Sequence, residues 1–287
     1  MTQAQSASAA TVRLLVLGKR LRDLRDAAGK SFEDAAACLG VSVLAIRRIE
    51  QGQVKWKLPY IKMLLEEYGV SGEEASTFLT MAMEANQPGW WYRYRDVLPD
   101  WFRAFVSLEE EASLMRAYEP HYIPGLLQTE DYARAVLRAG LRDEREIERR
   151  VELRMQRKRR LIEPGGPDFW VVIDETVLRR PVVAPKVMRD QIDHLIEMVA
   201  LPNVNLQVIP FALYVHEGMY GPFQLFRFPY KELQDIVYVE TVLGSFYVDQ
   251  YDDVTAFQAA LDRMSALAPP PQRTEALLSA IQKEIKE

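Results

Sequence analysis

The sequence predicts an all-α helix-turn-helix domain followed by an α+β domain. Short helical patterns broken by glycine fill roughly the first 70 residues, while strand patterns appear only in the second half of the chain. The chain has 287 residues, about twice the usual length of one domain, which favours two folded units. We expect four parts: a disordered tail over residues 1–10, a helix-turn-helix domain over 11–70, a linker helix over 71–89, and an α+β domain over 90–287.

The first domain opens with its longest helix. From Val12 onward, leucines recur at helical spacing and stop at Gly29, a residue type that commonly ends a helix. Ser31 then starts a short second helix, and Asp34 three residues later completes a capping pattern. This helix is expected to end at Gly40.

The third helix follows a turn after Gly40 and is the candidate recognition helix. Ser42 is placed to cap it, and its apolar residues fall on one face that should pack on the core. Those apolar residues are Val43, Ile46 and Ile49, which leaves Leu44, Arg47, Arg48 and Gln51 on or near the outer side. Two more helices are predicted, from Pro59 to Tyr68 and from Ser71 to Glu84.

The second domain mixes helices with strands. The sequence Gln87-Pro88-Gly89 breaks the helical pattern, so we place the domain boundary around residues 70–90. Helices are expected from Ser107 through the sequence SLEEEASLMRAYE, and over 129–140, 143–163, 184–201, 252–266 and 272–286. Strands are expected over 168–173, 205–209, 222–228 and 236–240.

The charge of the chain is unevenly distributed. The whole chain has a formal charge of −5, which would argue against nucleic acid as a partner. Residues 1–70, however, hold 11 lysines and arginines against 7 acids, a net of +4, and the remaining 217 residues have a net of −9. This asymmetry is typical of a chain in which one domain meets a polyanion.

Several classes of function find no support in the sequence. No apolar run is long enough to span a membrane, and the first residues lack a signal-peptide pattern, so a cytoplasmic location without membrane contact is expected. Cys38 is the single cysteine, which fits a reducing compartment. His121, His194 and His216 lack metal-ligand spacing, so we expect neither a metal site nor a cofactor.

Catalysis has a few candidate residues. Asp174, Glu175 and Glu240 each follow or end a predicted strand, where substrate-facing carboxylates often lie. Acidic residues at strand ends are more often solvated or paired with nearby arginines, here Arg179 and Arg180. We therefore expect no enzyme activity, and an enzyme domain fused to a DNA-binding domain remains an alternative.

The first domain resembles the xenobiotic-response-element (XRE) type of helix-turn-helix. The segments LGKRLRDLRDAAGKSFEDAAACLGVSVLAIRRIEQG and LPYIKMLLEEYGV carry the resemblance. It implies a four- or five-helix domain that binds double-stranded operator DNA as a homodimer. In that family an arginine at the position of Arg25 commonly pairs with a glutamate at the position of Glu50.

The predicted DNA contacts differ from those common in this family. Phe32 stands where a phosphate-binding glutamine is usual, so that contact should be missing, and Val43 and Leu44 replace polar side chains early in the recognition helix. These three departures leave open a domain that has kept its fold but lost tight DNA binding. A separate alternative is a helical bundle with a run of surface charge and no DNA role. Specificity is assigned mainly to Arg47 and Arg48, because arginine can grip guanine O6 and N7. The expected DNA-binding residues are Ser42, Val43, Leu44, Arg47, Arg48, Lys55 and Lys57, the two lysines as phosphate contacts.

The second domain also carries a resemblance, for which PGLLQTEDYA is the most specific segment. It resembles the C-terminal domain of unknown function in actinomycete regulators described as toxin-antitoxin-like or WhiJ-type, whose genes often lie beside one for a small partner protein. The resemblance implies transcription regulation with a small-molecule or protein input. The alternative is an antitoxin-like interaction module that binds a small partner protein and only autoregulates its own operon.

Two residue clusters are candidates for binding in this domain. Aromatic side chains crowd residues 90–105, where they could line a pocket or an interface, or equally form an inter-domain seam. The expected ligand- or partner-binding residues are Trp90, Trp91, Tyr94, Trp101 and His121. A basic helix over 143–163 could touch DNA, but its interleaved acids favour a solvated, salt-bridged helix.

Overall fold

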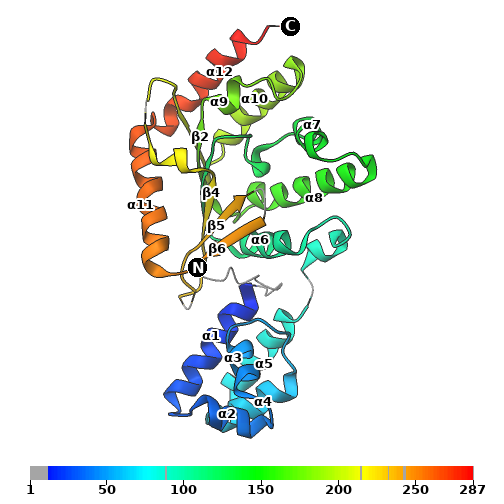
Figure 1. The fold of residues 1–287 in the computed structure, drawn as a ribbon, viewed down its shortest axis with the longest axis vertical. Helices are drawn as coiled ribbons and strands as arrows, with labels where there is room; N and C mark the ends of the chain where they lie inside the picture. Colours follow the sequence, from blue (N-terminus) through cyan, green and yellow to red (C-terminus); the bar gives the residue numbers. More distant parts are fainter. Residues whose placement is uncertain (1–11, 88, 214, 232, 242–243, 287) are drawn as a thin grey trace. The chain divides into compact units, whose positions relative to one another are not determined.

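A computed structural model of the chain describes residues 12–87, 89–213, 215–231, 233–241 and 244–286, with only the backbone at Asp100 and Trp101. The tail predicted over residues 1–10 lies outside these residues. The chain divides into two compact units, Met1–Glu111 with Pro229–Gln234 and Ala112–Phe228 with Asp235–Glu287. A helical region followed by a mixed α/β unit with a six-stranded sheet confirms the predicted fold class (Figure 1).

The first unit begins with the predicted series of helices, coloured blue to cyan in Figure 1. Ser31 forms the predicted capping box, because its Oγ accepts a hydrogen bond from the Asp34 amide while the Asp34 carboxylate accepts one from the Ser31 amide. Gly40 adopts the left-handed conformation after the second helix, with φ of 63°. The helices are α1 (Val12–Ala27), α2 (Phe32–Leu39), α3 (Val43–Glu50), α4 (Leu58–Glu67), α5 (Gly72–Ala85), the 3-10 helix η1 (Trp90–Tyr94) and α6 (Asp100–Glu111).

Helix α5 is part of the helix-turn-helix core and not the linker that the sequence suggested. Phe78, Ala82 and Ala85 are buried in the same hydrophobic cluster as the core residues of α1 to α4. The ring of Phe78 also stacks on Trp56, with centroids 5.9 Å apart. The first unit extends to Glu111, well past the boundary expected near residues 70–90.

Helix α1 and the end of α3 approach each other closely at Gly18. A Cβ atom added to Gly18 would lie 2.3 Å from the Glu50 carbonyl oxygen, which belongs to the backbone and cannot swing away. A Cβ atom added to Gly52 would likewise lie 2.7 Å from the backbone carbonyl carbon of Leu14. These two glycines therefore set how tightly α3 is held against α1.

Replacing Gly18 with alanine should lower the free energy of unfolding of the first unit. We expect a loss of about 1–3 kcal/mol, because the added methyl group forces the two backbones apart. Chemical denaturation measures the loss. Gly140→Ala is the matched control, since Gly140 ends a helix with open space around its Cα, and it should be neutral or slightly stabilising. Equal stability of the two variants would contradict the close approach.

The second unit is built on one mixed sheet with the strand order β3-β2-β1-β4-β5-β6. Strands β1, β2 and β3 are parallel, and β4 runs antiparallel to β1, as do β5 to β4 and β6 to β5. The carboxyl ends of β1, β2, β3 and β5 therefore lie at the same edge. The strands are β1 (Leu114–Glu119), β2 (Asp168–Asp174), β3 (Val204–Ile209), β4 (Phe223–Arg227), β5 (Ile236–Thr241) and β6 (Gly244–Val248).

Strand β1 corrects the helix that was predicted to run on from Ser107. The sequence Leu114–Glu119 is rich in helix-forming residues, but it pairs with β2 on one edge and β4 on the other. Hydrogen bonding along both edges overrides the local helical preference. Only the first part of the predicted helix, which belongs to α6, is helical in the structure.

Helices cover the sheet on both sides. Figure 1 shows α11 along one side and α7 and α8 on the other. Val254, Leu261 and Met264 of α11 share a buried cluster with sheet residues such as Val172 and Leu225. The helices of this unit are η2 (Gly125–Leu127), α7 (Glu130–Gly140), α8 (Glu144–Ile162), α9 (Thr176–Arg179), α10 (Pro185–Val199), η3 (Glu217–Tyr220), α11 (Tyr251–Leu267), η4 (Pro271–Arg273) and α12 (Thr274–Glu284).

The PGLLQT segment forms a buried hydrogen-bonded turn at η2. Gln128 donates to the Ile123 carbonyl at 2.6 Å and accepts from Arg154 at 2.6 Å. The fully buried Gln191 of α10 donates to the Leu127 carbonyl and accepts from the Thr129 amide. Buried amide side chains require such partners, which explains why both glutamines are tied to backbone groups here.

Candidate nucleic-acid interface

Helix α3 presents one face to the core and the other to solvent. Ile46 and Ile49 are buried, and Ser42 caps the helix by accepting a hydrogen bond from the Ala45 amide at 3.3 Å. Arg47 and Arg48 are exposed, and Leu44 is 58% exposed. A leucine this exposed, one residue inside the start of the helix, leaves an apolar group beside two arginines on the outer face.

A buried ion pair fixes the end of α3. The Nε and Nη2 atoms of Arg25 donate to the two carboxylate oxygens of Glu50 at 2.7 and 3.1 Å. Both side chains are at least 95% buried. Hydrogen bonding to Glu50 also raises the pKa of Arg25 above its ordinary value, despite burial. This pair confirms the one that the family resemblance implied.

The loop after α3 is held by Trp56. Its indole nitrogen donates to the Ile49 carbonyl at 3.3 Å, and its backbone amide and carbonyl both bond to the side chain of Asn86. Trp56 is buried, while its neighbours Lys55 and Lys57 are exposed. The two lysines therefore flank a residue that is bonded both to the end of α3 and to Asn86.

The basic side chains of this unit divide into two groups. Several on α1, the α1–α2 turn and α4 lie beside carboxylates, as in Arg13–Glu111, Arg22–Asp26, Lys30–Glu67 and Lys62–Glu66. Within the described part of the chain, no carboxylate pairs with the cations of α3 and the following loop, nor with Lys19 of α1. The unpaired cations of α3 and the loop are Arg47, Arg48, Lys55 and Lys57. Four unneutralised charges on one helix and its loop are what a phosphate backbone would attract.

Two of the predicted contact residues have structural partners of their own. The hydroxyl of Ser42 is occupied by its cap, and Val43 packs partly against the hydrophobic core. Phe32 was expected only to remove a phosphate contact. Its ring instead lies close to the guanidinium groups of Arg25 and Arg47, a contact that sequence spacing alone did not indicate.

The predicted aromatic site is spread over both units. Trp91 and Tyr94 are buried, and Trp90 packs edge-on against Tyr94 with ring centroids 6.2 Å apart. The side chain of Trp101 lies outside the described residues. His121 belongs to the second unit, where it is exposed and 3.7 Å from the Glu119 carboxylate.

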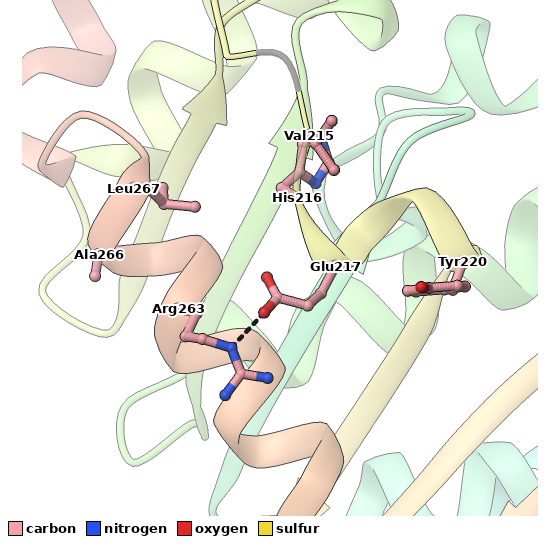
Figure 2. Close-up of a pocket in the computed structure, with 7 residues that line it drawn as sticks. All are labelled: Val215, His216, Glu217, Tyr220, Arg263, Ala266 and Leu267. Atoms are coloured by element: carbon pink, nitrogen blue, oxygen red, sulfur yellow. Dashed lines mark hydrogen bonds and ion pairs between the residues drawn. The ribbon is translucent and has the colours of Figure 1, made fainter.

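An open pocket of about 560 Å³ lies between η3 and α11 in the second unit (Figure 2). Its walls are mainly apolar, from Val215, Tyr220, Ala266 and Leu267, with an ion pair between Arg263 and Glu217 at one side. His216 also lines the pocket and is buried, and its Nδ1 atom has no hydrogen-bond partner among the described residues. Trp90, Trp91, Tyr94 and His121 are not among the described residues that line this pocket.

The candidate catalytic carboxylates are engaged in local contacts. Asp174 accepts a hydrogen bond from the Thr176 amide at 2.8 Å. Glu175 pairs with Arg179 and accepts from the Phe211 amide, and Glu240 accepts from the Tyr238 hydroxyl at 3.0 Å. Within the described residues, no three His, Cys, Asp or Glu side chains gather as a metal site would require.

Glu119, at the carboxyl end of β1, makes the stability of the second unit depend on pH. Burial, with a smaller contribution from Glu240, raises its pKa to about 7 from an ordinary value of 4.5. The folded state therefore binds a proton more tightly than the unfolded chain, and stability should fall as pH rises from about 4.5 through 7.

Replacing Glu119 with glutamine should flatten this part of the stability curve and stabilise the second unit at pH 8. Urea unfolding at a series of pH values measures the slope. Glu148→Gln is the control, because its pairing with Arg134 lowers the pKa of Glu148 and places its own effect below pH 4.5. An unchanged slope in the Glu119 variant would show that this carboxylate titrates normally.

Several basic and acidic side chains of helix α8 form ion pairs. Glu148 pairs with Arg134 of α7 at 2.6 Å, and Arg150 with Glu146 at 2.6 Å. Arg149 lies 3.3 Å from Glu152 one turn away. These pairs support the salt-bridged interpretation of the helix over a second DNA contact.

Two models of known protein families match the chain. A model described as "Helix-turn-helix domain" matches residues 16–78, and one described as "Domain of unknown function (DUF5753)" matches residues 102–280. No curated protein and no solved structure matches the chain. Among the described helices, none has the length and apolar character needed to cross a membrane. A helix-turn-helix domain suggests DNA binding. The second model covers more than half of the chain, which therefore belongs to the DUF5753 family and carries a helix-turn-helix domain at its N-terminal end.

Proposed function

We propose that the chain is a sequence-specific, DNA-binding transcriptional regulator of the XRE type that acts in the cytoplasm. The observation that carries the proposal is the group of exposed, unpaired cations on α3 and its loop. The net charge of −5 does not oppose it, because the first 70 residues carry +4. Salt screens electrostatic attraction to phosphates beyond about a Debye length, roughly 8 Å at physiological salt. The charge near the contact surface therefore determines the attraction to DNA, and the net charge of the whole chain does not.

The geometry of α3 suits the major groove. An α-helix fits this groove, and side chains on its outer face can reach base edges. In this arrangement Arg47 and Arg48 read guanines, and the exposed Leu44 contacts a thymine methyl group. Lys55 and Lys57 bind phosphates beside the groove, which fixes the register of the helix.

A homodimer completes the proposed regulator. A recognition helix of eight residues reads only a few base pairs, so two copies are needed to specify an operator. Helix-turn-helix dimers place their two recognition helices about 34 Å apart, one turn of the duplex. The operator should therefore contain two related half-sites with centres about 10 base pairs apart.

The second unit is proposed to receive a signal from a small molecule or a partner protein. The open pocket in Figure 2 supports this, together with the strongly exposed Val215 and Tyr220 that line it and the exposed Phe211 and Met219 close to them in sequence. The local contacts of Asp174, Glu175 and Glu240 support a unit that binds and does not catalyse. These exposed apolar side chains also favour the alternative, an antitoxin-like module that holds a small partner protein, as in the toxin-antitoxin-like and WhiJ-type actinomycete regulators that the chain resembles.

Fluorescence anisotropy with the full chain tests the DNA-binding proposal. Duplexes that tile the DNA upstream of its own gene are titrated at several salt concentrations. We expect one duplex to bind more tightly than a scrambled version of it, and Lys55→Ala to lower the salt slope by about one. No selective duplex at moderate salt would overturn the proposal. A stable 1:1 complex with the product of the neighbouring gene, with DNA binding limited to its own operon, would favour the alternative.

A further inference from the structure

Phe32 lies where two arginines of the helix-turn-helix meet. It is the first residue of α2, and its half-buried ring packs against the hydrophobic core. The guanidinium carbon of Arg25 lies 4.1 Å from the ring centroid, and that of Arg47 lies 5.0 Å from it. Both distances are within the range of cation–π attraction.

The two arginines differ in what else holds them. Arg25 is fixed by Glu50, by Asp26 at 2.6 Å and by the Lys30 carbonyl at 2.8 Å, so its charge is neutralised and its position is set. Arg47 is exposed, and in the described part of the chain the ring of Phe32 is the only group that holds its guanidinium. Arg48, its neighbour on α3, has no such contact there.

We infer that Phe32 is a positioning residue that orders the side chain of Arg47 before DNA is bound. An exposed arginine samples many rotamers, and fixing it on binding costs entropy. A ring that already holds the guanidinium group lowers that cost. The inference rests on the proposed DNA-binding function and replaces the expectation that Phe32 only removes a phosphate contact.

A double-mutant cycle tests the coupling between the two residues. Phe32→Leu, Arg47→Ala and the double variant are titrated with the selective duplex. Phe32→Leu should weaken binding by about 2- to 5-fold, the equivalent of one exposed cation–π contact. In the Arg47→Ala background the same change should have no further effect, and Phe32→Trp, which keeps an aromatic face, should retain wild-type affinity. Equal weakening in both backgrounds, or none in either, would overturn the inference.

A second measurement needs no DNA. Nuclear magnetic resonance order parameters of the arginine Nε–H groups report side-chain mobility in the free protein. Phe32→Leu should make Arg47 more mobile and leave Arg48 unchanged. Equal mobility of Arg47 in both proteins overturns the inference whatever the DNA result. If Arg47 is ordered by Phe32 but no duplex is bound selectively, only the proposed function fails.

Discussion

Replacing Glu50 with alanine is expected to lower the free energy of unfolding of the helix-turn-helix unit by about 3–5 kcal/mol. The change removes the carboxylate that accepts from Nε and Nη2 of Arg25, and breaking a buried ion pair by removing one partner is costly. The loss should be confined to the first unit. Hydrogen-exchange mass spectrometry measures it, since amides of α1 to α5 should exchange faster while those of the central strands β1 and β2 keep their protection.

Glu66→Ala is the matched control for this prediction. Glu66 also forms an ion pair in the same unit, with Lys62 at 3.9 Å, but both side chains are exposed. Surface pairs of this kind contribute about 0–1 kcal/mol, so its exchange pattern should remain close to wild type. If Glu50→Ala is no more destabilising than Glu66→Ala, the buried pair does not hold α3 in place.

The double variant Arg47→Ala, Arg48→Ala is expected to lose discrimination between the operator and a scrambled duplex. Each arginine that grips a guanine with two hydrogen bonds contributes about 1–3 kcal/mol, so the pair should contribute about 2–6 kcal/mol. Competition anisotropy with the two duplexes measures the ratio of affinities. Binding to the scrambled duplex should weaken much less, because base contacts are absent there.

The control for this variant removes the same charge elsewhere. Arg134 and Arg138 of α7 are paired with carboxylates in the second unit, so Arg134→Ala, Arg138→Ala changes the net charge equally without touching α3. It should keep the wild-type ratio. A similar loss in both double variants would mean that overall charge, and not base contact, determines binding.

Local signals in the sequence were enough to predict the helix-turn-helix. The serines at 31 and 42 and the glycine at 40 act through backbone geometry within a few residues, so their roles follow from spacing. Strand β1 could not be predicted in this way, because its partners β2 and β4 are distant in sequence and its own residues favour a helix. The missed β6 is a short strand at the sheet edge with a single neighbour.

The candidate DNA-binding site also combines features that follow from the local sequence with features that depend on tertiary packing. That Arg47 and Arg48 would be exposed followed from the helical period, since buried isoleucines occupy the opposite face. That they lack carboxylate partners, and that Phe32 contacts Arg47, depends on how α2 and α3 pack. For Phe32, the sequence predicts only the loss of a phosphate contact. The position of its ring beside the buried Arg25 depends on the tertiary fold.

Methylation interference at guanine N7 tests the central claim most directly, because this atom lies in the major groove and is a hydrogen-bond acceptor for arginine. Operator DNA carrying random N7-methyl groups is sorted into bound and free fractions with the full chain. We expect interfering guanines in two half-sites about 10 base pairs apart, and loss of the interference at one guanine of each half-site in Arg48→Ala. Interference that is absent from the major groove, or that is identical in wild type and Arg48→Ala, would contradict the claim that α3 reads the operator.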